Sequence, residues 1–419
     1  MGLLAQLMAF RRPRPAGVDI TSPAFKADPY PFYARLREES PVSPVTLPNG
    51  LTAWLVTRYD DVAAVLRDER FAKHPANALT PEQIARMPRI PRAFQPLDRN
   101  MLSADGPDHN RLRDLVQRAF TPGLVEGMRR RVQQIADHYL DALAGRPRFD
   151  LIRDYALPIP TTVIAEMLGV PVEDRHRFHR WSRSILLSSS SRWGLWKTLP
   201  ALWSFLRYIR RLIDARRAAL RDDLVSALIR AEEAGDRLSG EELMAMIFLL
   251  LVAGHETTVN LIGNGVLALL EHPEQLSRLR ADPGLIRPAV EELLRFASPV
   301  ETTSRRFARE DVTVAGVTIP RGALMFAVIA SANRDRRQFP DPDRLDLSRE
   351  PNRHLAFGLG PHYCIGAPLA RLEGQIAVQT LLRRAPGLRL DVPPQRLRWR
   401  GGVIVRGLEA LPVAVDAWA

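Results

Sequence analysis

Hydrophobic residues recur at three- and four-residue spacings between charged residues along most of the chain. This spacing places them on one face of an α-helix. We expect helices over residues 59–70, 124–143, 224–234, 240–271, 285–296 and 367–384. Short β-like segments are fewer and do not alternate with helices: 52–57, 312–319, 324–330 and 403–405. The pattern therefore predicts a mainly α fold with small β-sheets, not a doubly wound sheet.

No linker divides the chain, so we expect an N-terminal tail over residues 1–18 and a single large domain over residues 19–419. Two long stretches lack a clear period. Residues 71–101 contain five prolines, and residues 181–203 hold four of the seven tryptophans. The first stretch is predicted to be an irregular functional loop. The second is either a helix-loop-helix with inward aromatics or a mobile apolar lid over a site.

Composition and charge narrow the class of protein. With 419 residues, 46% of them hydrophobic, the chain can bury a large core, and its one cysteine, Cys364, excludes an internal disulfide and a cysteine-rich metal site. The net charge of +12 makes an acidic partner plausible, but the basic residues are spread out and form no nucleic-acid motif. The longest apolar run, Met244–Gly254, is well short of the roughly 20 residues that a bilayer requires. We expect a cytoplasmic protein without stable membrane insertion or nucleic-acid binding.

The cysteine lies in a distinctive segment, Phe357-Gly-Leu-Gly-Pro-His-Tyr-Cys-Ile-Gly366. Glycines and proline predict an irregular loop before Cys364, and a helix is expected to follow it. The N-terminus of a helix lowers the pKa of a thiol and favours the thiolate, which is a nucleophile or a soft metal ligand. His362 alone establishes no catalytic dyad, whereas one thiolate suffices as an axial ligand of haem iron. The alternative is an inert, buried cysteine.

A group of polar residues, Ala253-Gly-His-Glu-Thr-Thr258, interrupts the apolar stretch of the longest predicted helix. Burying Glu256 and Thr257 costs free energy unless they are paired or hydrated, so their presence indicates a functional site. Gly254 lies on the same face as Thr257 and opens a groove there. An alcohol beside a carboxylate suits proton delivery to a bound ligand. The structural alternative is that Thr257 bonds to a helix carbonyl and Glu256 pairs with an arginine.

A third motif, Glu292-Leu-Leu-Arg295, places opposite charges one helical turn apart and is weak evidence by itself. The order and spacing of all three motifs, however, resemble the cytochrome P450 family of haem-thiolate monooxygenases. The cysteine segment matches the family pattern F-x-x-G-x-H/R-x-C-x-G, the helix matches A/G-G-x-D/E-T, and the third matches E-x-x-R. The resemblance implies the cytochrome P450 fold and a haem b cofactor.

The resemblance also implies roles for particular residues. Cys364 would be the iron ligand, with Phe357 packed near the sulfur and Gly366 at a fixed position of the loop. Thr257 and Glu256 would deliver protons during dioxygen activation. A structural ion-pair network would comprise Glu292, Arg295 and Arg344. The haem propionates would be bound by His109, Arg113, Arg306 and His362.

The expected pocket is apolar and large. It should be lined by the face of the long helix and by two later segments: Met246, Leu250, Ala253 and Gly254, then Val300, then Val403 and Ile404. This suits hydroxylation or epoxidation of a macrolide, fatty acid, terpenoid or steroid. Electrons should come from a ferredoxin or flavodoxin with its reductase, docked near Arg111, Arg118, Arg353 and Arg371. The alternatives are a peroxide-using peroxygenase and a haem-thiolate sensor or carrier.

Overall fold

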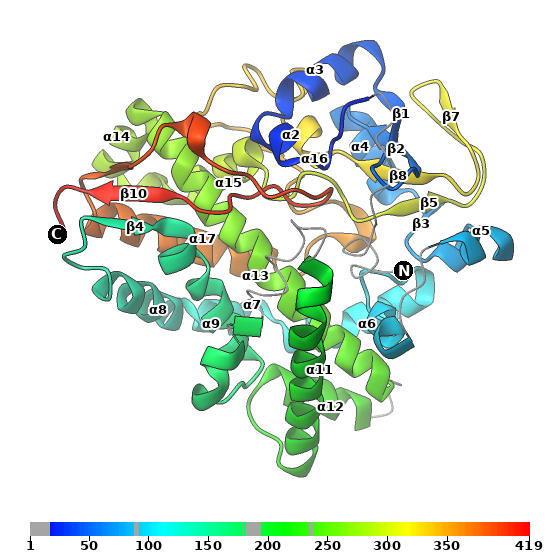
Figure 1. Cartoon of the computed structure of the whole chain (residues 1–419), viewed down its shortest axis with the longest axis horizontal. Coiled ribbons are helices and arrows are strands. Elements are labelled where there is room, and N and C mark those ends of the chain that lie inside the picture. Colours follow the sequence, from blue (N-terminus) through cyan, green and yellow to red (C-terminus); the bar gives the residue numbers. More distant parts are fainter. Residues whose placement is uncertain (1–16, 88–91, 179, 182–193, 234–237) are drawn as a thin grey trace.

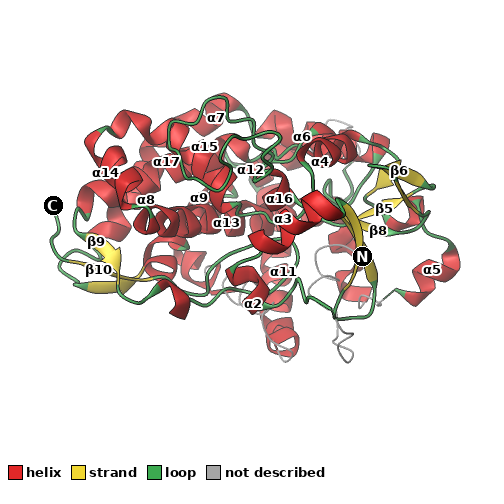
Figure 2. Cartoon of the chain, turned by 90° about the horizontal axis from the view of Figure 1, so that it is seen from above, coloured by secondary structure: helices red, strands yellow, loops and turns green. Residues whose placement is uncertain are grey.

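The computed structural model describes residues 17–87, 92–178, 180–181, 194–233 and 238–419. Helices form most of this part, and the strands gather in separate places (Figures 1 and 2). In Figure 2 the strands β5, β6 and β8 lie toward one end of the molecule, and β9 and β10 lie at the other. The predicted mainly α fold with small β-sheets is confirmed. Residues 1–16 of the predicted tail lie outside the described residues.

The helices enclose the largest cluster of buried apolar side chains, which extends from Phe94 to Val415. In chain order the α-helices are α2 (Pro23–Ala27), α3 (Tyr30–Glu39), α4 (Tyr59–Arg67), α5 (Pro81–Arg86), α6 (Gly106–Ala119), α7 (Pro122–Gly127), α8 (Arg129–Asp141), α9 (Pro158–Met167), α11 (Gly194–Ala218), α12 (Leu224–Glu233), α13 (Gly240–Glu271), α14 (Pro273–Ala281), α15 (Ile286–Ala297), α16 (Ile329–Ala332) and α17 (Ala367–Arg384).

Helix α13 crosses the middle of the molecule (Figure 1) and has the bounds that its apolar pattern predicts. Its 32 residues span about 48 Å at 1.5 Å per residue. A capping box begins it: the Ser239 hydroxyl accepts from the Glu242 N–H, and the Glu242 carboxylate accepts from the Ser239 N–H. Among the described residues, α13 is the one helix long and apolar enough to span a membrane, but 72% of its most apolar window is buried inside the protein. It is the central core helix.

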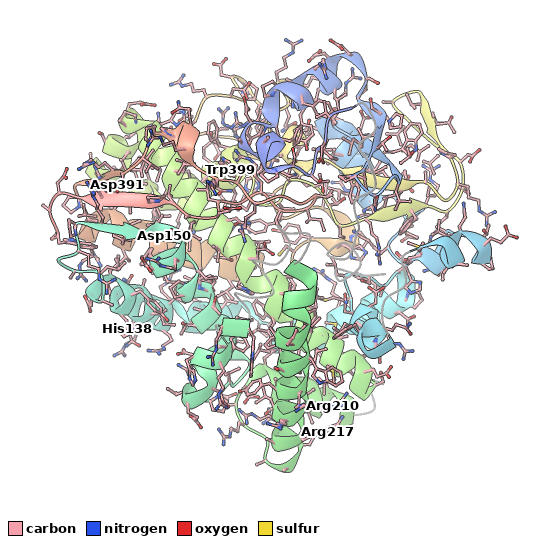
Figure 3. The ribbon with its side chains drawn as sticks, in the orientation of Figure 1. His138, Asp150, Arg210, Arg217, Asp391 and Trp399 are labelled. Carbon is pink, nitrogen blue, oxygen red and sulfur yellow. The ribbon has the colours of Figure 1, made fainter. Side chains whose placement is uncertain are left out.

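The larger sheet has the strand order β1 (Val42–Thr46), β2 (Thr52–Val56), β8 (Leu324–Ala327), β5 (Arg306–Ala308) and β3 (Phe71–Ala72). Only β2 and β8 pair in parallel, with Ala53 opposite Leu324; the other pairs are antiparallel. A three-stranded antiparallel sheet joins β4 (Arg148–Asp150), β10 (Pro412–Val415) and β9 (Leu388–Leu390). Asp150 and Asp391 lie beside this smaller sheet (Figure 3).

Two predicted strands are shorter than their apolar patterns. Residues 312–319 form a hairpin of β6 (Val312–Val314) and β7 (Val317–Ile319), because Ala315 and Gly316 both take positive φ in the two-residue turn. Residues 324–330 divide into β8 and α16, which begins at Ile329. Both predictions were wrong in extent, because alternating apolar residues do not reveal where the chain turns.

Three further segments differ from expectation. The predicted helix over residues 124–143 is interrupted at Met128, between α7 and α8. Residues 403–405 form no strand, only an isolated bridge from Val405 to Val300. The described parts of 71–101 are not irregular throughout, since they contain β3, the 3₁₀ helices Pro75–Asn77 and Arg92–Asp98, and α5.

Residues 182–193 of the tryptophan-rich stretch lie outside the described residues. Trp181 packs inward against Phe205 and Tyr208, with ring centroids 6.0 and 5.4 Å apart. Trp203, in contrast, is 50% exposed on α11. The two alternatives for this stretch, an ordinary helix-loop-helix and a lid, therefore both remain predictions.

Candidate active site

The cysteine loop, residues 357–366, is closed by a hydrogen bond within its own backbone. The Cys364 N–H donates to the Phe357 carbonyl at 2.9 Å, and Gly358 and Gly360 take positive φ of 71° and 74°. A Cβ on Gly360 would lie 3.0 Å from the Leu66 carbonyl oxygen, so a side chain there would push the loop away from the end of α4. Helix α17 begins at Ala367, as predicted. The glycines therefore let the loop hold Cys364 at the start of a long helix.

The environment of the Cys364 thiol differs from the expectation of a lowered pKa. Backbone N–H groups of Gly366 and Ala367 donate to the sulfur, and the charges of Arg113 and Arg371 also favour the thiolate. Burial outweighs these contributions and raises the pKa of the thiol. Yet Cys364 has accessible surface. We infer that this surface faces an enclosed space within the protein, where the sulfur is shielded from bulk water.

Helix α13, like Cys364, has accessible surface in an otherwise buried region. Most of its residues are buried, but Ala253 and Gly254 are exposed and Glu256 and Thr257 are half-buried. A Cβ on Gly254 would make only an ordinary contact, 3.8 Å from Ile164 Cδ1. Since α9, α11, α15 and α17 all pack against α13, this patch indicates an internal space. The groove predicted at Gly254 agrees with this arrangement.

Glu256 and Thr257 make both contacts that the structural alternative requires. The Thr257 hydroxyl donates to the Ala253 carbonyl at 3.1 Å, and Arg400 Nη1 donates to Glu256 Oε1 at 3.3 Å. Burial raises the pKa of Glu256, and the charge of Arg400 opposes that rise. Arg400 Nη2 also donates to Asn260, one turn further along α13. These contacts show how the pair is held, and they leave its accessible surface directed at the internal space.

A cluster of cations and imidazoles lies beside the cysteine loop. The rings of His109 and His362 are 4.1 Å apart, and Arg306 is 3% exposed with no hydrogen-bond partner for Nε among the described residues. Burial lowers the pKa of Arg306 to about 10 and, together with the charge of Lys73, lowers the pKa of His362. Arg113, half-buried on α6, also acts on His362. The structure thus brings together all four residues expected to bind propionates.

Lys73 belongs to this cluster and was missed in the sequence analysis. Its Nζ donates to the Ser304 hydroxyl at 2.7 Å, and burial together with the charge of Arg306 holds its pKa well below the usual value. The sequence offered one signal, which was the rarity of lysine. The chain has only three lysines, and both Lys26 and Lys73 are buried. Lys26 is neutralised by Glu301 at 2.8 Å, whereas Lys73 has no ion pair among the described residues.

Glu292 and Arg295 form a fully buried pair on α15. Arg295 Nε and Nη2 donate to the two carboxylate oxygens, both at 2.7 Å. The prediction for Arg344 was wrong: its side chain is exposed, and only its carbonyl accepts from Arg295. The arginine that reaches Glu292 is Arg349, at 3.1 Å. The reason is geometric, since the turn after Asp341 points the Arg344 side chain outward and brings residue 349 back to α15.

The predicted pocket residues divide into two groups. Ala253, Val300, Val403 and Ile404 keep accessible surface, and the Val300–Val405 bridge places the last two segments together. Met246 and Leu250 are buried, with 1% and 7% of their surface exposed. The prediction for Met246 was wrong, because its sulfur accepts the Met101 N–H and the side chain is covered there.

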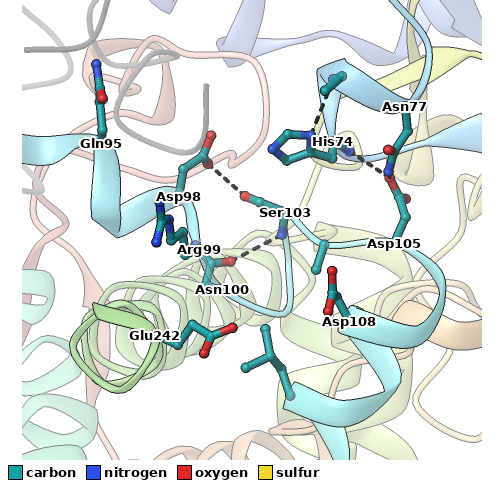
Figure 4. A pocket seen from close by; sticks show the side chains of 13 residues that line it. His74, Asn77, Gln95, Asp98, Arg99, Asn100, Ser103, Asp105, Asp108 and Glu242 are labelled. Atoms are coloured by element: carbon teal, nitrogen blue, oxygen red, sulfur yellow. Dashed lines mark hydrogen bonds between the residues drawn. The ribbon is translucent and has the colours of Figure 1, made fainter. Parts of the chain in front are cut away.

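A polar cavity of about 570 Å³, whose lining contains no residue of the cysteine loop, lies between residues 74–77 and 95–105, α6 and the start of α13 (Figure 4). Its four carboxylates are all engaged: Asp98 accepts from Ser103, Asp105 from His74 and Asn77, and Glu242 from Arg111, while Asp108 lies 3.7 Å from the same arginine. Because its charged groups are satisfied by the chain itself, this cavity is not the candidate active site.

Comparisons with known proteins identify the fold and chemistry. The family model for cytochrome P450 matches residues 47–283 and 284–396. The chain is 48% identical over 396 residues to cytochrome P450 107B1 of Saccharopolyspora erythraea, covering 94% of this chain and 96% of that one. It is 44% identical over 384 residues to the mycinamicin IV hydroxylase/epoxidase of Micromonospora griseorubida, covering 91% and 94%.

Among solved structures, the myxobacterial cytochrome P450 CYP267B1 in complex with myristic acid superposes with a TM-score of 0.88 at 45% identity, covering 95% of this chain and 99% of that one. The chain therefore has the fold of the cytochrome P450 haem-thiolate monooxygenases. The chain belongs to the cytochrome P450 family. It is therefore a monooxygenase with a cysteine-ligated haem b, and it uses a redox partner and an apolar substrate.

The residues present fit a haem. Its ring carries two propionates, which require desolvated cations or donors. Arg306 offers a buried Nε without a partner in the described part of the chain, and Lys73 adds an ammonium group without an ion pair. For the iron, Cys364 offers one sulfur that accepts from the N–H groups of Gly366 and Ala367. The propionates and the iron would therefore both meet residues of complementary chemistry.

Proposed function

We propose that Cys364 is the thiolate ligand and that Glu256 and Thr257 supply protons to the reaction. When bound, the haem-thiolate group activates dioxygen with two electrons and two protons and inserts one oxygen atom into a substrate C–H or C=C bond. The observation that carries the proposal is that Cys364 and residues 253, 254, 256 and 257 keep accessible surface, although α13 is otherwise mostly buried and other helices pack around it. His109, Arg113, Arg306, His362 and Lys73 would hold the propionates.

In this proposal the chain's own residues control the protons. The raised pKa of Glu256 keeps a fraction of its carboxyl groups protonated closer to neutral pH than an exposed glutamate allows. Thr257 can exchange its hydrogen bond to Ala253 for one to a ligand without moving the helix. Arg400 limits the rise in the pKa of Glu256 and fixes its position. The pair thus forms a short path for protons into the internal space.

Replacing Thr257 by alanine is expected to separate oxygen consumption from product formation. Without the hydroxyl, proton delivery to the reaction is no longer directed, and reduced dioxygen leaves as hydrogen peroxide. Product formation should therefore fall by about 10²-fold while hydrogen peroxide accumulates. Thr258→Ala is the matched control, because Thr258 is 1% exposed and donates to the Gly254 carbonyl. The measurement compares product, consumed dioxygen and peroxide per electron in the reconstituted system.

The same experiment separates the alternatives. A peroxygenase would form product from hydrogen peroxide alone and would not depend on Thr257. A haem-thiolate sensor or carrier would form no product in any variant. If Thr257→Ala leaves both product and peroxide unchanged, the proposed proton path is wrong.

The substrate proposed for this chain is an apolar molecule of macrolide or fatty-acid class, with terpenoids and steroids as further candidates. One relative is named for mycinamicin IV, and one solved structure contains myristic acid. Ala253, Val300, Val403 and Ile404 supply apolar accessible surface on two sides. Optical titration of the holoenzyme with each compound tests the choice: the true class shifts the Soret band at low concentration, whereas the other leaves the spectrum unchanged.

We further propose that the redox partner is an acidic ferredoxin or flavodoxin, and that the protein works in the cytoplasm without membrane insertion. Of the four arginines predicted to dock it, Arg111 and Arg371 are each only 29% exposed. Arg353 and Arg118 are exposed. These last two are therefore the better candidates for contact with a partner.

Reversing both charges, in Arg118→Glu with Arg353→Glu, is expected to slow the first electron transfer about 10-fold at low salt and much less at high salt, because ions screen exposed charges. Stopped-flow reduction at two salt concentrations measures this rate. Arg210→Glu with Arg217→Glu is the control, since Figure 3 shows both arginines toward the lower end of α11. Equal rates for the wild type and the first variant at both salt concentrations would reject this docking face.

A further inference from the structure

An ion pair between α15 and α17 lies next to the cysteine loop and has no role in the functions proposed so far. Arg371 Nε and Nη2 donate to the two carboxylate oxygens of Glu291 at 2.7 and 2.8 Å. Arg371 Nη1 donates to the Tyr363 hydroxyl at 3.3 Å. The guanidinium therefore has its donors directed to one anion and one phenol, both within this chain.

The same guanidinium is stacked on the aromatic ring of the cysteine loop. Its central carbon lies 4.4 Å from the ring centroid of Phe357. Phe357 in turn accepts the Cys364 N–H through its carbonyl. A positive charge is thus held, through Phe357, close to the sulfur.

Glu291 compensates that charge. It accepts from His354 Nε2 at 3.0 Å in addition to its two bonds from Arg371, and these donors lower its pKa to about 2. The carboxylate therefore stays ionised over the working pH range. Glu291 and Arg371 are 28% and 29% exposed, so water weakens their charges but does not remove them.

We propose that the Glu291–Arg371 pair sets the reduction potential of the haem iron by holding a charge-compensated guanidinium beside the Cys364 sulfur. The inference rests on the proposed role of Cys364 as the iron ligand. Reduction adds one negative charge to the haem-thiolate unit, so an uncompensated cation nearby favours reduction and an uncompensated anion opposes it. Glu291 and Arg371 would influence the iron through Phe357 and the Cys364 sulfur. They are therefore positioning residues rather than catalytic ones.

Single substitutions of the pair should shift the potential in opposite directions. Glu291→Gln leaves the Arg371 cation without its anion and is expected to raise the potential. Arg371→Gln leaves the Glu291 carboxylate without its cation and is expected to lower it. One unit charge about 10 Å away at an effective dielectric constant of about 20 changes the ratio of reduced to oxidised protein roughly 10-fold, a shift of about 59 mV for one electron.

The experiment is a spectroelectrochemical titration of the substrate-free holoenzyme, in the wild type, both single variants and the double variant Glu291→Gln with Arg371→Gln. The double variant, which loses both charges, should return close to the wild-type potential. Arg371→Lys, which keeps the charge, should also stay close to it. The carbon-monoxide spectrum of each reduced variant checks that the thiolate is still bound.

The outcomes distinguish this inference from the role of Cys364. Single variants that shift the potential in the same direction, or leave it unchanged while keeping the thiolate spectrum, would overturn the charge-compensation proposal alone. A wild-type protein without the thiolate spectrum would overturn the ligand proposal instead. If Arg371→Gln binds no haem, the comparison of Glu291→Gln with Arg371→Lys decides: the first must raise the potential and the second must not.

Discussion

Replacing Cys364 by serine is expected to abolish the strongly red-shifted Soret band of the reduced carbon-monoxide complex and to reduce product formation by at least about 10³-fold. A serine hydroxyl is a far weaker electron donor than a thiolate, so it cannot promote cleavage of the O–O bond. No other residue offers a thiolate, because Cys364 is the only cysteine in the chain. The measurement is the difference spectrum of the reduced protein with and without carbon monoxide.

The control for this experiment changes the same loop without changing the ligand. Ile365→Val alters a half-buried neighbour of Cys364 and leaves every hydrogen bond of the loop in place. This variant should keep the red-shifted band. A band that survives in Cys364→Ser, or one that is missing from the wild type, would contradict the assignment of Cys364 as the ligand.

Substituting Glu292 by glutamine is expected to lower the free energy of unfolding by about 3–5 kcal/mol. Glu292 and Arg295 are both 0% exposed, and the carboxylate accepts from Arg295, Arg349, Asn352 and the Asp346 N–H. An amide directs N–H groups at some of these donors and leaves the Arg295 cation buried without its anion. Urea unfolding of the holoenzyme, followed by circular dichroism and by the Soret band, measures the loss.

Arg344→Ala is the matched control, because it removes an exposed side chain and keeps the carbonyl that accepts from Arg295. Its effect should stay within about 0.5 kcal/mol. Replacing Glu292 and Arg295 together by methionine removes both fully buried charges and should cost less than the single change, because the remaining cation, Arg349, still donates to the Pro340, Asp341 and Arg344 carbonyls. A loss below about 1 kcal/mol in Glu292→Gln would show that the buried network is not essential for stability.

Elements whose signals are local could be predicted from the sequence. Helices α13 and α17 have the predicted bounds, because a long apolar run, the Ser239 cap and the glycines before Ala367 are all encoded within a few residues of each end. Extended segments were less predictable. Residues 403–405 resemble a strand, but they make only one bridge, since a strand requires a partner whose position depends on the rest of the fold.

Within the site, residue identity was predictable and electrostatics was not. The three motifs already singled out Cys364, Thr257 and Glu292. The direction of the Cys364 pKa was wrong, because the local N–H groups that favour the thiolate are outweighed by burial, which arises from the whole protein. Thr257 and Arg400 show the same difference: the first belongs to a motif, whereas the second approaches Glu256 from 144 positions away.

The amino-acid sequence by itself determined the family, the positions of the main helices and the residues able to carry haem-thiolate chemistry, because these depend on patterns within short segments. Only the tertiary structure decided which charges meet: Arg349 rather than Arg344 at Glu292, Lys73 beside Arg306, and Arg371 between Glu291 and Phe357. Coulomb energies depend on distance and on access to water. Both quantities are set when distant segments pack, so spacing along the chain could not reveal them.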